Sequence, residues 1–212
     1  MENNEQKMNI HHNMTNFNMQ LFKKYNEEVK LALKDDDERY WHSVSVAITA
    51  VNLADTYGAD KDNCLVAGIL HDYCKCLSID KMLSMCEKYG VNLSEEDKNA
   101  DGCIHGFLAA KVCKEKFDIN DEVYNAIYYH TCGRPNMTIL EKIIYISDFI
   151  EPLRRFRDRV EEVRVLAYKD IDKAIVLSAE MGLNFLKRTN KFIHSNTQKT
   201  LDYYKNLINS HS

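Results

Sequence analysis

Residues 64–75 read Cys-Leu-Val-Ala-Gly-Ile-Leu-His-Asp-Tyr-Cys-Lys. The apolar run that opens this stretch predicts a buried helix, and His71 and Asp72 then place two polar side chains at its end. Burying an imidazole beside a carboxylate costs free energy unless a partner compensates, and a metal ion is a suitable partner. A His-Asp pair alone is weak evidence, so its meaning depends on the polar residues elsewhere in the chain.

Four further residues of types that bind metals interrupt apolar helical patterns. His42 begins the polar side of an amphipathic segment, His105 opens an apolar helix and His130 ends another. Asp148 interrupts the nearly continuous apolar stretch 143–150, where an unpaired carboxylate would cost on the order of a few kcal/mol or stay protonated. Each residue alone has an ordinary structural explanation. Together, six residues indicate a site for one or two divalent cations: His42, His71, Asp72, His105, His130 and Asp148.

Cations accompany these candidate ligands. Lys75 lies one turn after His71 if that helix continues, and Arg134 lies in a turn whose backbone is fixed by neighbouring Gly and Pro residues. Arg154 would come near Asp148 if the helix that holds Asp148 continued past it. A metal ion combined with fork-shaped guanidinium groups is suited to binding phosphate.

The sequence predicts an all-α fold. It has only two Pro and seven Gly, and no segment shows the sustained alternation of a strand. The polar, aperiodic residues 1–17 predict a disordered extension, and residues 18–212 a single domain. The expected helices are 18–34, 38–57, 62–73, 79–89, 103–116, 121–130, 139–151, 161–168, 170–189 and 197–208.

Two helix starts have a capping sequence. In Thr138-Ile-Leu-Glu141 and in Ser94-Glu-Glu-Asp97, the first and last side chains can each satisfy a backbone N–H group of the other residue. Both stretches are therefore expected to begin helices by reciprocal capping.

The composition excludes several classes of protein. A net charge of −4 and a pI near 6.1 argue against general nucleic-acid binding, which needs a basic face. Seven Cys without paired spacings favour a reducing compartment over a disulfide framework. No apolar run approaches the ~20 residues of a membrane span. We expect a cytoplasmic protein that does not bind membranes, and a homodimer is among the oligomeric states that the sequence allows.

The sequence resembles the HD-domain metal-dependent phosphohydrolases, and more narrowly the YqeK family of symmetrical diadenosine-tetraphosphate hydrolases. The resemblance covers roughly residues 37–207 and implies an HD-domain helical bundle. Two departures are Cys74 and Cys132, which stand where Ala and Thr are expected. Residues 157–159 replace a Pro-Gly turn, which affects the loop after Phe156 and not the metal site. The similarity is carried by residues 39–42, 70–75, 105–106, 130–137 and 140–152, followed by Arg154.

The resemblance implies roles for individual residues. His42, His71, Asp72 and Asp148 would hold one metal ion, expected to be iron, although other divalent transition metals are also suitable. His105 and His130 either complete a second metal site, with Asp72 bridging, or contact substrate phosphates, and the second metal site is favoured. The residues expected around the nucleotide are Arg39, Lys75, Thr131, Gly133, Arg134, Arg154, Arg155, Asn196 and Thr197.

The implied reaction is hydrolysis of diadenosine tetraphosphate to two ADP by attack of metal-bound water. Lys75 and Arg134 would stabilise charge on the phosphate oxygens, and Asp72 is the third expected catalytic residue. One alternative is another HD-domain nucleotide phosphohydrolase, a nucleotidase or a deoxynucleotide triphosphohydrolase, although His105 and His130 count against a one-metal nucleotidase. A di-iron oxygenase would not need the cations. A non-catalytic nucleotide-binding regulator would not need an intact ligand set.

Overall fold

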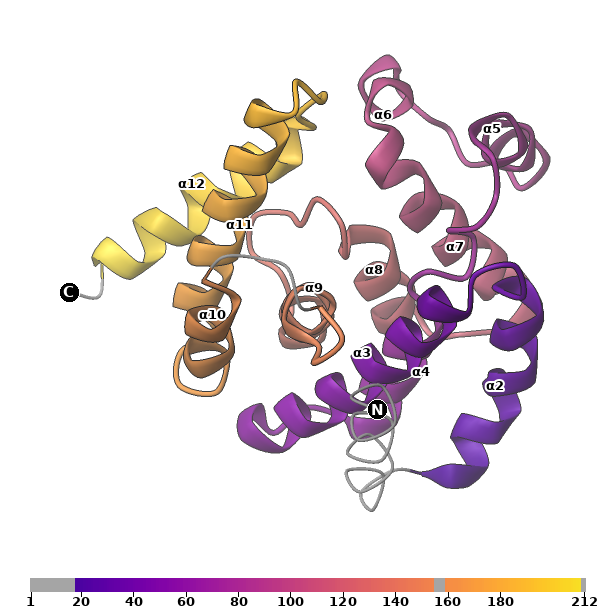
Figure 1. Cartoon of the computed structure of the whole chain (residues 1–212), viewed down its shortest axis with the longest axis horizontal. Helices are drawn as coiled ribbons and strands as arrows, with labels where there is room; N and C mark the ends of the chain where they lie inside the picture. The colour runs from indigo at the N-terminus through magenta and orange to yellow at the C-terminus, as the bar shows by residue number, and fades with distance from the viewer. Residues whose placement is uncertain (1–17, 155–158, 211–212) are drawn as a thin grey trace, which may run out of the picture.

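The computed structural model describes residues 18–154 and 159–210, and every regular element within them is a helix (Figure 1). The all-α prediction is therefore confirmed, whereas the predicted extension 1–17 lies outside the described residues. Among the described residues, no helix combines the length and the apolar composition that a membrane span requires. The helices are α2 (Met19–Ala32), α3 (Asp37–Tyr57), α4 (Lys61–Leu70), α5 (Ile79–Lys88), α6 (Glu95–Asn99), α7 (Asp101–Phe117), α8 (Asp121–Tyr129), α9 (Ile139–Ile150), α10 (Val160–Ala167), α11 (Ile171–Arg188) and α12 (Ser195–Ser210).

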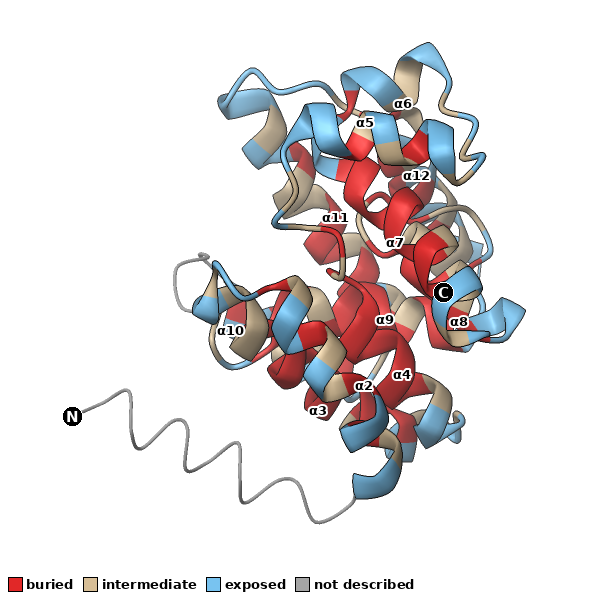
Figure 2. Cartoon of the chain, turned by 90° about the vertical axis from the view of Figure 1, so that its right-hand side faces the viewer, coloured by how far each residue is buried: buried red, intermediate tan, exposed pale blue. Residues whose placement is uncertain are grey.

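Helices α3, α4, α8 and α9 form the centre of the molecule. α3 packs against α4 and α9, and α8 packs against both α4 and α9. These helices carry much of the buried surface, as Figure 2 shows for α3, α4 and α9. α7 packs against α8 and also contacts α5 and α6. α11 packs against α9 and also contacts α10 and α12. The α6–α7 pair and the α11–α12 pair thus flank the centre on opposite sides (Figure 1).

A glycine allows α3 and α4 to approach closely. A Cβ atom at Gly68 of α4 would lie 2.6 Å from Cα of Ala47 in α3, and Ala47 is itself fully buried. Only a residue without a side chain fits at that distance. Because His42 lies on α3 and His71 follows α4, this contact sets the separation between the two histidines.

Helix α4 is shorter than the predicted 62–73. It ends at Leu70, and the N–H of Tyr73 donates to the Leu70 carbonyl at 3.0 Å in a tight turn. His71 Nδ1 lies 2.7 Å from the Gly68 carbonyl, so the imidazole satisfies one of the carbonyls that a helix end leaves unpaired. The expectation that Lys75 follows on a continuing helix was wrong, because the chain turns at His71.

A histidine also binds a free carbonyl at the end of α8. This helix stops at Tyr129, and Nδ1 of His130 lies 2.7 Å from the Ile127 carbonyl. Both histidines therefore bind the carbonyl three residues earlier and turn their Nε2 atoms away from their own helix. This fixes the ring orientation with the backbone alone.

One of the two expected capping boxes is complete. Ser94 and Asp97 cap each other reciprocally, but the box begins the short helix α6, which the predicted helices did not include. At the start of α9, Thr138 accepts from the Glu141 N–H at 3.3 Å, as expected. The Glu141 carboxylate instead pairs with Arg134, so reciprocal capping at this position was a wrong prediction.

Although the sequence allowed it, the helix that contains Asp148 does not continue as far as Arg154. α9 stops at Ile150 and Glu151 leaves the helical conformation with ψ of 146°. The chain then turns, and the N–H of Arg154 donates to the Glu151 carbonyl at 3.0 Å. Arg154 reaches Asp148 through this turn and not along a continued helix.

Replacing Gly68 by Ala should destabilise the protein, because the added methyl group would overlap the α3 backbone. Overpacking of this kind costs about 1–3 kcal/mol, and thermal denaturation followed by circular dichroism should show a lower Tm. Gly182 in α11 is a matched control, since a Cβ there meets nothing within 4 Å. Gly182→Ala should be neutral or stabilising. An unchanged Tm in Gly68→Ala would contradict the close approach.

Candidate metal centre and its surroundings

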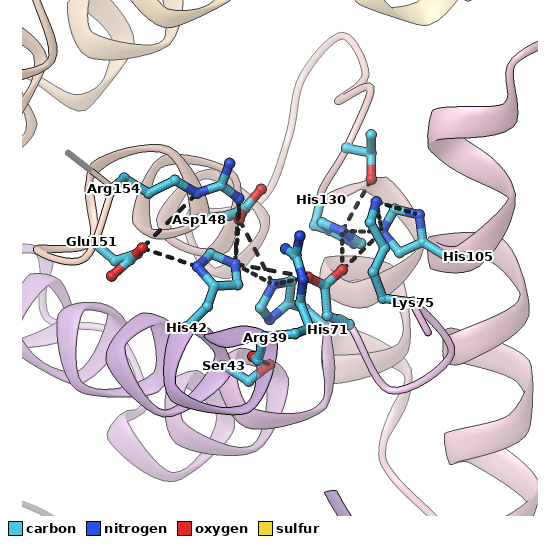
Figure 3. A network of polar contacts seen from close by, with 12 residues as sticks. Arg39, His42, Ser43, His71, Lys75, His105, His130, Asp148, Glu151 and Arg154 are labelled. Atoms are coloured by element: carbon cyan, nitrogen blue, oxygen red, sulfur yellow. Dashed lines mark hydrogen bonds and ion pairs between the residues drawn. The ribbon is translucent and has the colours of Figure 1, made fainter. Parts of the chain in front are cut away.

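Six side chains from five parts of the fold converge at the centre of the molecule (Figure 3). His42 lies on α3, His105 on α7 and Asp148 on α9, while the remaining three follow the ends of α4 and α8. Five of the six are buried, and Asp148 keeps 23 % of its side chain exposed. The structure therefore brings together all of the metal ligands that the sequence predicted: His42, His71, Asp72, His105, His130 and Asp148.

The Asp72 carboxylate stands between two pairs of histidines. Its Oδ2 atom lies 3.4 Å from Nε2 of His71 and 3.7 Å from Nε2 of His42. Its Oδ1 atom lies 2.9 Å from Nε2 of His105 and 3.8 Å from Nε2 of His130. Each oxygen thus faces one pair, and two potential metal-binding groups share this one carboxylate.

The first pair has the chemistry of a cation site. Nε2 of His42 and Nε2 of His71 are only 3.3 Å apart. Each ring has an acceptor at its other nitrogen, the Glu151 carboxylate for His42 and a backbone carbonyl for His71. In neutral rings the protons therefore sit on Nδ1, and two Nε2 lone pairs face each other. With Asp148 Oδ1 2.9 Å from His42 Nε2, this nitrogen and oxygen set fits a divalent transition metal.

The second pair is already contacted by donors. Nε2 of His130 lies 3.0 Å from Nε2 of His105 and 3.0 Å from the Thr131 hydroxyl. The Lys75 ammonium lies 3.2 Å from Nδ1 of His105. Cations border the first pair too, since Arg39 donates to Asp72 Oδ2 and Arg154 Nη2 lies 3.4 Å from His42 Nε2. The two groups differ in ligand number, because Asp148 adds a fourth candidate ligand to the first pair.

Burial and neighbouring charges shift the pKa values of this cluster. Burial raises the pKa of Asp72, but the positive field and hydrogen bonds of His71 and His105 outweigh it and hold the pKa well below its usual value. Burial lowers the pKa of His42, but its bonds to Asp148 and Glu151 reverse the direction and raise it. Burial, aided by the neighbouring histidines, lowers the pKa of His130 to about 3.

Three cations border the ligands (Figure 3). Asp36 caps α3 by accepting from the Arg39 N–H at 2.8 Å, which sets Arg39 one turn before His42. Arg39 Nη1 donates to Asp72 Oδ2 at 2.9 Å. Arg154 Nη2 donates to Asp148 Oδ1 at 2.6 Å. Together with Lys75, these side chains place positive charge around the candidate ligands.

Arg134 lies on the loop that follows His130 and is held by a different partner. Its Nε and Nη2 atoms donate to the two oxygens of Glu141, each at 2.8 Å, and its guanidinium lies 5.1 Å from the centre of the Tyr129 ring. Two of its five N–H groups are therefore engaged by protein. Gly133 has φ of +66°, and a Cβ there would lie 2.8 Å from Oγ1 of Thr200, so α12 packs directly on this loop.

The remaining predicted nucleotide contacts lie farther along the chain. Asn196 and Thr197 begin α12, which is tied to α6 because the Ser195 N–H donates to Glu96 at 2.7 Å. Both backbone N–H groups bind His194. The Asn196 N–H donates to His194 Nδ1, and the Thr197 N–H donates to the His194 carbonyl. Arg155 lies outside the described residues.

Sequence reasoning missed two buried glutamates. Glu141 and Glu151 are each 1 % exposed, and they bind Arg134 and His42 respectively. A signal was present, because both carboxylates border the apolar run of α9, where an unpaired charge is costly. The partner of Glu151 could not be read from the sequence, since Glu151 and His42 are 109 residues apart.

Most of this chain, including the segment that contains the candidate metal centre, is similar to a known protein family. The family model for the HD domain matches residues 39–153. A symmetrical bis(5'-nucleosyl)-tetraphosphatase of Halalkalibacterium halodurans is 39% identical over 167 residues, which cover 77% of this chain and 87% of that relative. The enzyme of the same name from Bacillus subtilis is 36% identical over 168 residues, covering 79% of this chain and 89% of the relative.

A solved structure has the same fold. A crystal structure from Clostridium acetobutylicum, described as a "predicted HD superfamily hydrolase involved in NAD metabolism", superposes with a TM-score of 0.82 at 36% identity. The match covers 87% of this chain and 97% of that one.

The buried His130 should make the metal-free protein sensitive to acid. Its pKa is about 3 in the native protein and about 6.5 in an unfolded chain. Below pH 6.5 the unfolded state therefore binds a proton that the native state does not, so stability that is present above pH 6.5 is lost as the pH falls toward 3. Each such group contributes up to about 1.4 kcal/mol per pH unit in that window.

Urea denaturation of chelator-treated protein at several pH values between 6.5 and 4 measures this effect. The free energy of unfolding should fall more steeply for the wild type than for His130→Asn, while the opposing contribution of His42 is common to both. Parallel pH profiles for the two proteins would rule out a neutral, buried His130.

Proposed function

The chain belongs to the HD-domain family and, within it, to the YqeK family of symmetrical bis(5'-nucleosyl)-tetraphosphatases, and we propose that its buried centre performs the hydrolysis this name describes. The substrate is diadenosine tetraphosphate, and the products are two molecules of ADP. The observation that carries the proposal is the juxtaposition of a shared metal-ligand cluster with three cations that suit a polyphosphate.

We propose that a metal ion binds to His42, His71, Asp72 and Asp148. A cation bound there supplies a water molecule of lowered pKa as the nucleophile and neutralises charge on the phosphoryl oxygens. We propose iron as this metal, because imidazole and carboxylate ligands suit it, and other divalent transition metals meet the same donor set. The Nδ1–H groups of His42 and His71 donate to the Glu151 carboxylate and the Gly68 carbonyl, which leaves their Nε2 atoms available as ligands.

We propose a second, weaker metal site at Asp72, His105 and His130. The separate oxygen that Asp72 directs at this pair supports a bridging carboxylate. This site has three protein ligands against four at the first site, because Asp148 lies beside His42 and not beside this pair, and the Lys75 ammonium lies 3.2 Å from His105. The two sites should therefore differ in affinity for the same metal.

The cations of the chain bind and orient the polyphosphate in this proposal. Arg39 and Arg154 pair with ligand carboxylates and keep further N–H groups for phosphate oxygens. Lys75 lies beside His105 and supplies a positive charge for oxygens that become more negative during the reaction. Asp72 acts mainly as a ligand, since a coordinating carboxylate is a poor proton acceptor.

The rest of the nucleotide is proposed to lie against the loop after His130 and the start of α12. Thr131 and Gly133 present a hydroxyl and a close backbone there, and Thr200 of α12 contacts this loop. The other proposed contacts are Arg134, Arg155, Asn196 and Thr197. The seven free cysteines support a reducing, cytoplasmic location. The homodimer stays a prediction that a measurement of solution mass would test.

The proposed activity is tested by incubating the iron-loaded protein with a panel of nucleotides and separating the products by chromatography. Diadenosine tetraphosphate should give ADP alone, and Asp72→Ala should lose both metal content and hydrolysis while its helicity is largely retained. The cause is that Asp72 serves both histidine pairs. Undiminished turnover in metal-free Asp72→Ala would refute the proposal.

The same panel separates the competing functions. Release of nucleoside from a monophosphate, or of triphosphate from a deoxynucleotide, would indicate another HD-domain phosphohydrolase. Oxygen consumption with a phosphate-free substrate would indicate an oxygenase, for which the three cations have no role. Binding without turnover would indicate a regulator.

Arg134 should contribute through the geometry of its guanidinium group. Arg134→Lys keeps the charge but cannot hold Glu141 with two parallel bonds while presenting further donors to a phosphate. We expect kcat/KM to fall by about ten- to several-hundred-fold, which corresponds to the ~1.5–3 kcal/mol of a charge-assisted hydrogen bond. Metal content, measured by elemental analysis, should stay constant.

Lys75→Met is the companion variant. It should show its deficit mainly in kcat if the ammonium acts on charge that develops in the transition state. Wild-type kinetics in both variants would remove these two cations from the reaction and favour the oxygenase alternative.

A further inference from the structure

Glu151 contacts the candidate metal centre without being one of its ligands. Its side chain is almost fully buried, and Oε1 lies 3.0 Å from Nδ1 of His42 (Figure 3). Its Oε2 accepts a hydrogen bond from the Leu153 N–H at 2.7 Å. Both carboxylate oxygens are therefore occupied as acceptors, one by an imidazole and one by the backbone.

The backbone around Glu151 is held as firmly as its side chain. Its N–H donates to the Ser147 carbonyl at 3.0 Å, the last turn of α9. Its own carbonyl accepts from the Arg154 N–H at 3.0 Å and from Nη2 of Arg164 in α10 at 2.9 Å. Contacts from two helices and a turn thus fix where this carboxylate points.

His42 needs such a partner more than His71 and His130 do. His71 and His130 each follow a helix end and bind a free carbonyl of their own helix. His42 lies inside α3, where the carbonyls already bind the N–H groups of the next turn. A helix-interior histidine therefore has to find the acceptor for its Nδ1 elsewhere, and α9 supplies it through Glu151.

We propose that Glu151 is the positioning residue of His42, which keeps the proton of the ring on Nδ1 and directs Nε2 at the metal ion. The inference rests on the proposed metal site at His42, His71, Asp72 and Asp148. A histidine ligand whose other nitrogen binds a carboxylate is fixed in tautomer and orientation and is a stronger ligand. Glu151 would thus raise metal affinity without touching metal or substrate.

Glu151→Gln tests this role because the amide nearly preserves shape but has only one acceptor. The Leu153 N–H and His42 Nδ1–H bind different oxygens of Glu151, and an amide places an acceptor oxygen at only one of these two positions. If its oxygen binds Leu153, its NH₂ group faces His42 and forces the ring proton onto Nε2. That tautomer cannot bind a metal through Nε2, so affinity should drop.

The measurement is a titration of chelator-treated full-length protein with Co²⁺ alone, in competition with a chromophoric chelator. The wild type should show a tight and a weak step. Glu151→Gln should weaken the tight step by about 10- to 100-fold and leave the weak step, which depends on His105 and His130, unchanged. Glu151→Asp retains two acceptor oxygens on a shorter arm and should recover part of the affinity.

Glu141→Gln is the matched control. Glu141 is equally buried and lies near the start of α9, whose end Glu151 follows. Its substitution removes the same charge, but its partner is Arg134 and not a histidine. It should leave both steps of the titration unchanged. Circular dichroism and the metal-free Tm of each variant separate loss of the fold from loss of the ligand, and Glu151→Asp carries the test if Glu151→Gln does not fold.

The outcomes distinguish the two proposals. Absence of a tight step in the wild type would refute the proposed metal centre itself. A tight step in the wild type that persists unchanged in folded Glu151→Gln would overturn the role of Glu151. An equal loss in Glu141→Gln would also overturn it, because the effect would then follow from any missing buried charge. Selective loss in Glu151→Gln with partial recovery in Glu151→Asp would establish it.

Discussion

The position of the Asp72 carboxylate is the constraint on which the rest of the structure depends. One oxygen faces His42 and His71 and the other faces His105 and His130, so a single side chain has to meet helices α3, α4, α7 and α8 at once. Its burial is tolerated because four imidazoles and Arg39 surround it. The close contact of Gly68 with α3 and the early end of α4 both serve to bring this carboxylate to the centre.

The helix ends explain why this cluster can be both buried and well ordered. A helix leaves its last carbonyls unpaired, and an imidazole that follows the helix can bind one of them through Nδ1. His71 and His130 use this bond, so the feature that ends each helix also orients a potential ligand. His42 lies inside a helix and has no free carbonyl to bind, so its Nδ1 binds the carboxylate of Glu151 instead. Local backbone chemistry and long-range packing thus contribute different members of one site.

The sequence predicted the helical fold and singled out the six residues that converge at the centre, because both depend on local pattern. Apolar periodicity marks the helices, and a polar residue inside an apolar run marks each candidate ligand. Features that depend on packing were not predictable: α4 ends earlier than its pattern suggests, Arg154 follows a turn and not a continued α9, and Glu141 leaves its capping role to bind Arg134. Glu151 was missed for the same reason. A periodic pattern shows that a charge needs a partner, but only the fold shows which residue provides it.

The balance of charge connects this architecture to the proposed substrate. Asp72, Asp148 and Glu151 carry three negative charges, and Arg39, Lys75 and Arg154 carry three positive ones, each in contact with one of the four histidines or with Asp72. This set is close to neutral before any ligand is counted. A divalent cation would leave it positive in a buried region, where uncompensated charge is costly. A polyphosphate offsets this positive charge and a neutral substrate cannot, so the same electrostatics that let the cluster fold also favour an anionic substrate over an uncharged one.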